Sequence, residues 1–315
     1  MLILVGLVAL TIGAELVVRS GARLAQRAGI PPMLVGLTIV SLGTSLPELA
    51  VGVDAVRSGA GSLAVGNITG TNVVNLLLIL GLSASIRPIV LGMQTLRLDL
   101  PAMALAALLL YVFGRDGTLT AVEGAILLAA AVIYTLLLIR QTRRENPSVV
   151  AEYDAEYPAE RSGPVAWQVV LLTVGLAVIL VGAHLLVQGA VGLARDLGVS
   201  DALIGLTVVA IGTSAPELAT TMVATFRGNR DIAIGNLIGS STYNVTFILG
   251  TSLLFARGPV AVDPELITVD LPVMVAAALV CLPIFLTGRR VTRVEGVLMV
   301  LAYAAYLAYL IIVRA

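Results

Sequence analysis

The fold of this chain is decided by a stretch that occurs twice, VGLTIVSLGTSLPELA at residues 35–50 and IGLTVVAIGTSAPELA at residues 204–219. The two copies are 169 residues apart and are identical at 11 of 16 positions. The same offset, without a gap, aligns AVGNITGTNVVN at 64–75 with AIGNLIGSSTYN at 233–244. An internal repeat of this length indicates a chain built from two related halves.

Composition places both halves in a membrane. Of the 315 residues, 58% are hydrophobic and 12% are charged, whereas soluble domains carry roughly 25% charged residues. The mean hydropathy is +1.03. Apolar runs of about 20 residues, long enough to cross the hydrocarbon core, recur along the chain. We therefore expect an all-α polytopic membrane protein whose surroundings are a lipid bilayer. The net charge of zero gives no indication of nucleic-acid binding.

Ten transmembrane helices are expected in two inverted-topology five-helix repeats. The first repeat covers 1–140, a cytoplasmic linker loop covers 141–164, and the second repeat covers 165–315. Because five is an odd number, the second repeat starts on the opposite side of the membrane from the first. The expected spans are 1–18, 33–57, 62–82, 98–114, 121–140, 165–190, 202–226, 232–254, 268–287 and 293–313.

The distribution of arginine predicts the orientation. With the N-terminus outside, 14 of the 19 basic residues lie at the cytoplasmic ends of the spans and 5 at the outer ends. Cytoplasmic loops are enriched in basic residues, and the reverse orientation would invert this ratio. We expect a multi-pass protein of the cell (inner or plasma) membrane with its N-terminus outside.

Each copy of the first motif places a carboxylate deep in an apolar span. Glu48 lies near the middle of the second span, and Glu217 holds the matching position in the seventh. Ionisable residues at this depth are energetically costly and mark functional sites. Pro47 and Pro216 lack an amide hydrogen, so we expect a kink or break beside each carboxylate. The carbonyl oxygens freed there are tolerated only where they line a watery cavity.

The groups around the two carboxylates are all hard oxygen ligands. Such ligands suit sodium, calcium or magnesium and disfavour soft transition metals. Calcium accepts a flexible oxygen set more readily than magnesium does, and two facing carboxylates neutralise one divalent cation. The residues four and three positions before each carboxylate carry hydroxyls and share its helix face: Thr44, Ser45, Thr213 and Ser214.

The second motif adds amides and further hydroxyls. Asn75 and Asn244 hold equivalent positions, and Thr71 and Ser240 precede them by one turn. One interpretation is that these groups only join helices to one another. Their repetition beside the Pro-Glu motif favours a role in the ion site. Small-x-x-x-small patterns in the same segments allow helices to approach closely: Gly66, Gly70, Gly235 and Gly239.

Other charged residues have structural interpretations. Glu15 and Arg19, one turn apart, predict an intrahelical ion pair, and the counterpart of Glu15 in the second half is His184, the only histidine. The remaining acidic pairs are duplicated helix-start signals: Thr120-x-x-Glu123, Thr292-x-x-Glu295, Asp99-x-Pro101 and Asp270-x-Pro272.

These paired motifs resemble the α-repeats of the cation/calcium exchanger superfamily. The resemblance is closest to the prokaryotic sodium/calcium antiporters, including the YrbG-like branch, and covers essentially the whole chain. It implies a secondary antiporter. Such a protein exchanges cytoplasmic calcium for external sodium by alternating access, with one central site and no cofactor. A membrane-embedded enzyme is a rival class, but the sequence has no Ser/His or paired-Asp arrangement and no His-Glu zinc spacing, so we do not expect an enzyme.

The resemblance also implies a ligand set. Glu48 and Glu217 would bind both calcium and sodium, and Thr44 and Thr213 would complete the calcium site. The expected sodium ligands are further hydroxyls and two backbone carbonyls: Ser45 with Thr71, Ser214 with Ser240, and the carbonyls of Ser41 and Ala210.

One departure from the family leaves alternatives open. Archaeal members pair an asparagine with an aspartate at the positions of Asn75 and Asn244, whereas both are asparagine here. The site then has one carboxylate fewer, which leaves the sodium stoichiometry open and gives calcium/proton antiport as the alternative function. A passive channel is a rival of another class, but channels more often build their filter between subunits. Here one chain supplies both halves of the site, so a monomer suffices.

Overall fold

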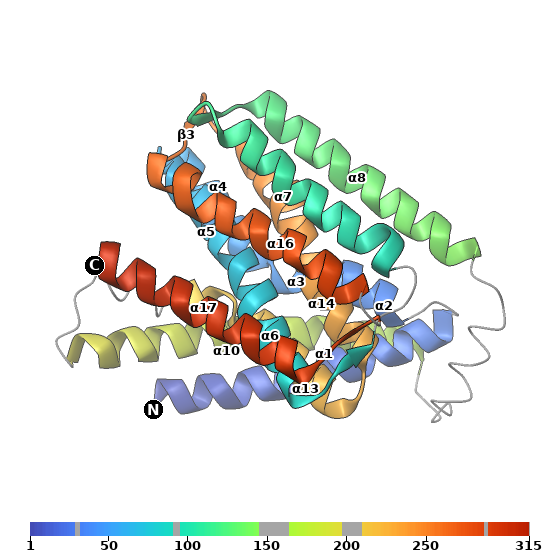
Figure 1. Ribbon diagram of the computed structural model, residues 1–315. Coiled ribbons are helices and arrows are strands. Elements are labelled where there is room, and N and C mark those ends of the chain that lie inside the picture. The colour runs from blue at the N-terminus through green and yellow to red at the C-terminus, as the bar shows by residue number, and fades with distance from the viewer. Residues whose placement is uncertain (29–31, 91–94, 145–163, 197–209, 287–288, 315) are drawn as a thin grey trace.

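The computed structural model describes residues 1–28, 32–90, 95–144, 164–196, 210–286 and 289–314, and nearly all of them are helical (Figure 1). Apolar side chains on the outer helices, such as Val132 and Leu301, are more than half exposed, as lipid-facing residues are. The predicted all-α polytopic class is confirmed. The long helices are α1 (Leu2–Ala28), α7 (Leu100–Gly114), α8 (Ala121–Arg144), α10 (Val165–Asp196), α16 (Leu271–Leu286) and α17 (Arg293–Arg314).

The number of spans is tested only in part. Within the described ranges, eight helices are long and apolar enough to cross a membrane, and a pair of helices meeting at a 45° bend makes a ninth span. The expected span 202–226 is described only from Ala210, so the count of ten remains a prediction. Most of the expected linker 141–164 also lies outside the described residues, and the division into two repeats stays a prediction.

The first motif breaks its helix beside the proline, as predicted. Ser45 leaves the helical region with φ −89° and ψ 11°, and the helix axis bends there by 45°. Pro47 lies in the first turn of the next helix, where its missing amide hydrogen removes no helical bond. Ser214, with φ −85° and ψ 4°, makes the equivalent break in the second half. The elements are α2 (Pro32–Val35), η1 (Gly36–Val40), α3 (Ser41–Thr44), α4 (Leu46–Arg57), α12 (Ala210–Thr213) and α13 (Ala215–Arg227).

The second motif forms a helix that widens into a π-helix at its asparagine. Asn75 lies in one π-helical segment, and Asn244 begins the other. π-Helical turns inside α-helices occur frequently at functional sites, but nothing in the sequence pattern predicted these segments. The elements are α5 (Gly61–Val73), η2 (Val74–Ile79) and α6 (Leu80–Ile86), then α14 (Arg230–Tyr243), η5 (Asn244–Leu249) and α15 (Gly250–Leu254); a further duplicated pair is η3 (Thr95–Asp99) and η6 (Leu266–Asp270).

Two short antiparallel strand pairs join the halves at the ends of the helices. β1 (Ile89–Val90) pairs with β4 (Arg290–Val291), and β2 (Thr118–Leu119) pairs with β3 (Val260–Ala261). β1 corresponds to β3 at the offset that relates Asp99 to Asp270, and β2 corresponds to β4 at the offset that relates Thr120 to Thr292. The two strand pairs are therefore equivalent when the halves are exchanged. The all-α prediction missed these strands because two residues are too few to show an alternating pattern.

The helices that carry the duplicated motifs lie at the centre of the molecule. In the span Arg230–Leu254, which contains α14, 94% of the 18-residue apolar stretch is buried inside the protein. In Arg293–Val313, which contains α17, the buried share is 22%. α1 and α10 run side by side at one edge (Figure 1). A methyl group added to Gly13 would come within 2.8 Å of the Gly175 carbonyl oxygen. The polar motif residues Glu48, Asn75, Glu217 and Asn244 are therefore enclosed by protein and held away from lipid.

The helix-start signals at Thr120 and Thr292 are confirmed as capping boxes. The Thr120 amide donates to Glu123 Oε2 at 2.6 Å, and the Thr292 amide donates to Glu295 Oε2 at 2.7 Å. The helix-start signal at Asp99 predicts a side-chain cap, but the Asp99 side chain makes no capping hydrogen bond. The π-helix η3 already leads into α7, and Asp99 is buried, where it accepts a hydrogen bond of 3.1 Å from the Tyr134 hydroxyl.

Candidate ion-binding site

The two motif carboxylates meet in the interior of the protein. Glu48 lies in the first turn of α4 and Glu217 in the first turn of α13, and both side chains have 0% exposure. They are close enough for their charges to interact directly. Each benefits from the positive end of its helix dipole, which favours a negative charge in the first turn. The fold therefore places the acidic side chains of the two repeats close together in the interior.

A hydrogen bond from one repeat reaches the carboxylate of the other. The Ser45 hydroxyl donates to Glu217 Oε1 at 3.1 Å. Thr71 lies near the Glu48 carboxylate, although neither its hydroxyl nor a Glu48 oxygen completes a hydrogen bond of standard geometry. Ser45 is the residue at which the helix breaks, and its hydroxyl is directed at the carboxylate of the other repeat.

An asparagine that the sequence analysis did not select connects the two motifs. The Asn236 side-chain amide donates to the Thr221 hydroxyl at 3.1 Å and lies 3.5 Å from the Glu217 carbonyl oxygen. Its own oxygen accepts from the Thr44 hydroxyl at 3.2 Å. The Thr44 hydroxyl also lies 3.1 Å from the Val40 carbonyl oxygen of its own helix, so Thr44 joins the two repeats. The signal for Asn236 was present, since Gly-Asn recurs at 66–67 and 235–236.

Several buried polar atoms in this region have no protein hydrogen-bond partner among the described residues. Such groups are rare in native proteins, and an ion or a water molecule is the usual explanation. The atoms from the predicted ligand set are both oxygens of Glu48, Oε2 of Glu217, the hydroxyls of Thr71 and Ser214, and both side-chain atoms of Asn75 and of Asn244. Helices of both repeats contribute to this group, which consists mainly of hard oxygen donors.

The remaining predicted ligands lie around this group. The Ser41 carbonyl accepts from the Ser45 amide at 3.1 Å and from the Ser240 hydroxyl at 3.4 Å. Thr213 ends α12, is half-buried and has a polar partner. Ala210 begins α12 at the edge of the described segment. The structure thus brings the predicted residues of α3, α4, α5, α13 and α14 to one region of the interior.

Close approach of helices, expected from the glycine patterns, is seen in the second half. A methyl group on Gly235 would lie 2.7 Å from the Met33 carbonyl oxygen, and one on Gly239 would lie 2.6 Å from that of Leu37. The described residues make no such close contact with Gly66 or Gly70. The segments equivalent to those around Met33 and Leu37 fall at 202–206, outside the described residues.

A model of the sodium/calcium exchanger protein family matches residues 1–140 and 167–312 of this chain. The chain belongs to the sodium/calcium exchanger protein family. The inner membrane protein YrbG of Escherichia coli (strain K12) is 36% identical, with 98% of this chain and 95% of YrbG covered. The sodium/calcium exchanger MaX1 of Methanosarcina acetivorans is 31% identical, with 98% and 97% covered.

A solved structure of the family has the same fold. The sodium-calcium exchanger NCX_Mj, soaked with sodium and strontium, matches with a TM-score of 0.84 at 30% identity, over 98% of this chain and 96% of that chain. The family membership confirms the predicted resemblance. This exchanger-family chain is a polytopic membrane transporter of the cation/calcium exchange type and not an enzyme.

Other predicted polar pairs are also present. Glu15 pairs with Arg19 on α1, as expected, and it also accepts a hydrogen bond of 3.0 Å from the Arg227 guanidinium of α13. His184 lies 2.9 Å from the Gln188 side-chain nitrogen on an exposed face of α10. His184 therefore does not repeat the ion pair that Glu15 forms in the first half.

Proposed function

We propose that this protein exchanges calcium for sodium across the membrane by alternating access, with one central oxygen-lined site built from both repeats. The observation that carries the proposal is the group of buried oxygens around Glu48 and Glu217 that have no hydrogen-bond partner in the described part of the chain. Unpaired carboxylates are tolerated in a membrane interior only where a counter-ion or water satisfies them. MaX1 and NCX_Mj, both sodium/calcium exchangers by name, support the choice of ions.

The charge of the site supports coupling between the two fluxes. Among the proposed ligands only Glu48 and Glu217 are ionisable, so the set carries two negative charges when both are ionised. One calcium ion or two sodium ions would neutralise them. Because an empty site leaves two like charges in a low-dielectric interior, reorientation without a bound ion is disfavoured. Calcium and sodium would therefore compete for the same oxygens, which couples their transport.

The proposed ligands divide between the ions according to their position. Glu48 and Glu217 serve both ions, with Thr44 and Thr213 adding oxygens for calcium. The sodium positions use the hydroxyls of Ser45, Thr71, Ser214 and Ser240, the amides of Asn75 and Asn244, and the carbonyls of Ser41 and Ala210. The Ser45–Glu217 hydrogen bond supports this division, because it links a proposed sodium ligand directly to a shared carboxylate.

Calcium/proton antiport is the second candidate, and the two asparagines favour it. With Asn75 and Asn244 both neutral, the proposed set has no third carboxylate, and two protons would neutralise it as well as two sodium ions do. The test is calcium-45 uptake into proteoliposomes of the purified protein. An outward sodium gradient and an outward proton gradient are applied separately, with the membrane potential clamped.

Uptake driven by the sodium gradient alone is the expected result. Uptake driven only by the proton gradient would replace the proposal with the second candidate. Flux that needs neither gradient would indicate a channel. The Glu217→Gln variant provides the control for leak, because it keeps the side-chain size and removes the charge.

We also propose that the N-terminus lies outside the cytoplasm of a cell whose inner or plasma membrane holds the protein. The arginine distribution and the inner-membrane relative YrbG support this placement. With ten helices, the C-terminus after α17 also lies outside. A C-terminal alkaline phosphatase fusion should then be active and a C-terminal green fluorescent protein fusion dark. The opposite result would reverse the orientation or change the number of spans.

A further inference from the structure

A line of threonines runs along α13 away from the ion site. Thr220, Thr221 and Thr225 follow Glu217 by three, four and eight residues, so all four side chains share one face of the helix. Each threonine is buried, with an exposure of 0%, 0% and 5% in that order. Over eight residues an α-helix rises by about 12 Å, so the line extends well beyond the proposed ligands.

One hydroxyl in this line has no hydrogen-bond partner among the residues that the structure describes. The Thr225 hydroxyl donates to the Thr221 carbonyl oxygen at 2.8 Å, and the Thr221 hydroxyl accepts from Asn236 at 3.1 Å. Most other buried threonines here bond back to the carbonyl four residues earlier, as Thr242 and Thr246 do. Thr220 Oγ1 is fully buried yet has no such bond among the described residues. A buried hydroxyl of this kind is satisfied by water or an ion.

The neighbouring helix α6 presents the same kind of polar face. α6 packs against α13. Ser83 on α6 is buried, and its hydroxyl also lacks a partner among the described residues. Arg87 follows directly after α6, where the backbone becomes extended with φ −142° and ψ 121°. Two helices, one from each repeat, therefore contribute unpartnered hydroxyls that lead away from the central site.

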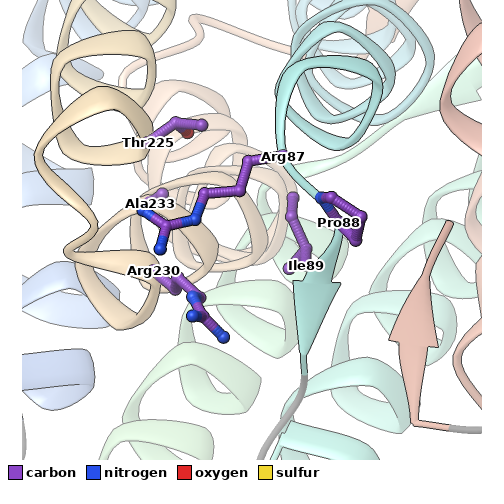
Figure 2. A pocket seen from close by; sticks show the side chains of 6 residues that line it. All are labelled: Arg87, Pro88, Ile89, Thr225, Arg230 and Ala233. Carbon is purple, nitrogen blue, oxygen red and sulfur yellow. The ribbon is translucent and has the colours of Figure 1, made fainter. Parts of the chain in front are cut away.

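The threonine line ends at a surface pocket. Figure 2 shows Thr225 and Ala233 beside the side chains of Arg87 and Arg230, with Pro88 and Ile89 completing the pocket wall. The Arg87 guanidinium lies against the end of α13, since its Nη1 would be 3.1 Å from a methyl group on Gly228. No ion pair within the described ranges holds Arg87 or Arg230. These arginines are expected on the cytoplasmic side.

The first repeat lacks this polar line. At the offset of 169 residues, Thr220, Thr221 and Thr225 correspond to Val51, Gly52 and Val56 on α4. The counterpart of Ser83 is Ser252, whose hydroxyl is satisfied by the Ile248 carbonyl oxygen at 2.8 Å. A structural need for threonine common to both repeats would have left hydroxyls in both. The difference points to a role on one side of the membrane only.

We propose that α13 and α6 line the route by which hydrated cations pass between Glu217 and the pocket of Arg87 and Arg230. The threonine and serine hydroxyls replace part of the hydration shell along this route. Arg87 covers its outer end and must move aside, because two guanidinium groups repel a cation at the mouth. This inference rests on the proposed ion site. On the expected cytoplasmic side, it assigns the route to the face of α13, a helix of the second repeat.

Cysteine accessibility tests the route without relying on transport. The chain has one cysteine, Cys281, which is buried, so Cys281→Ala gives a cysteine-free background. Single cysteines are placed at Ser83, Thr220 and Thr225, and controls at Val18 and Ile232, which are fully buried in an apolar cluster at the same end of the molecule. A cationic methanethiosulfonate (trimethylammonium-ethyl) and a neutral one (hydroxyethyl) are applied to the cytoplasmic face of inside-out vesicles. Modification is measured by mass spectrometry.

Both reagents should modify Thr220→Cys, Thr225→Cys and Ser83→Cys more than about tenfold faster than the two controls. Modification by the neutral reagent alone would mean that water but not cations enters, which overturns the route. Equal rates at the two control positions, or no modification at the polar positions, would also overturn it. Failure of the Glu48→Gln and Glu217→Gln variants to stop exchange would instead remove the ion site, so the two failures are distinguishable.

Discussion

α4 and α13 begin alike and then diverge. Both start after a serine that breaks the helix, and both hold a buried glutamate in the first turn. Beyond that turn, α13 continues with threonines where α4 has valine and glycine. Their carboxylates differ as well. Glu217 accepts a hydrogen bond from Ser45, whereas both oxygens of Glu48 lack a protein partner among the described residues. The duplicated motif positions the charges, and the residues around it make the two halves unequal.

The amide neighbours of the two carboxylates show the same inequality. Asn236 is held by the hydroxyls of Thr44 and Thr221. Its counterpart Asn67 leaves a buried amide nitrogen without a partner among the described residues, and the position equivalent to Thr221 is Gly52. A two-fold related scaffold thus surrounds a site that is not symmetric in its hydrogen bonds. Such a difference is expected if the two repeats adopt different conformations at any moment of the transport cycle, so that equivalent residues do not make the same hydrogen bonds.

The comparison predicts the largest effects where the halves are alike. Glu48→Gln and Glu217→Gln each remove one charged ligand from the proposed site. Hydrogen bonds and contacts with charged groups are worth about 1.5–3 kcal/mol each, so calcium affinity should fall by roughly 10- to 100-fold in both variants. Exchange in proteoliposomes should fall to background, and isothermal titration should report the weaker calcium binding.

Size-exclusion chromatography of both glutamate variants provides the control for folding, and each should elute as the parent does. Wild-type exchange by either variant would contradict the proposed site. A large loss in one variant and none in the other would contradict the sharing of the ion by both repeats.

The sequence predicted the symmetric part of the molecule and missed the asymmetric part. Glu48, Glu217 and the breaks at Ser45 and Ser214 follow from residues repeated at one fixed offset, and proline determines the break by its own chemistry. The bond from Ser45 to Glu217 could not be predicted, because the orientation of the serine depends on how the two repeats pack. The π-helices and two-residue strands also depend on tertiary packing and leave no periodic signal.

The second prediction uses the unequal asparagines. Asn236→Ala removes the hydrogen bonds to Thr44 and Thr221, but the Thr44 hydroxyl still has the Val40 carbonyl oxygen as an acceptor. We expect about 2 kcal/mol of lost stability, since each lost bond contributes about 1 kcal/mol. Asn67→Ala should cost clearly less. Thermal unfolding of the two variants in the same detergent measures the difference. Equal losses would contradict the unequal hydrogen bonding of the two asparagines.

The third prediction concerns the hydrogen bond between the repeats. Ser45→Ala removes the donor to Glu217 Oε1 and should lower the stability of the ion-free protein by about 1.5 kcal/mol, as expected for a bond to a charged group. Ser214→Ala should have little effect in the same ion-free state, because the Ser214 hydroxyl has no described partner. Thermal unfolding in a chelator without sodium tests the pair. A larger effect at Ser214 would show that the bond belongs to the opposite repeat in solution.

The smallest predicted effect returns to a feature that the halves share. Glu123→Ala and Glu295→Ala each break a capping box, in which the carboxylate accepts from the amide of Thr120 or Thr292. Loss of a capping interaction costs about 1 kcal/mol. Both glutamates lie at the start of a helix and not near the central carboxylates, so transport by the folded fraction should not change. The two variants should lower the unfolding temperature by the same amount, with Glu123→Gln and Glu295→Gln as controls that keep an acceptor. A change in calcium affinity in either alanine variant would contradict a purely structural role.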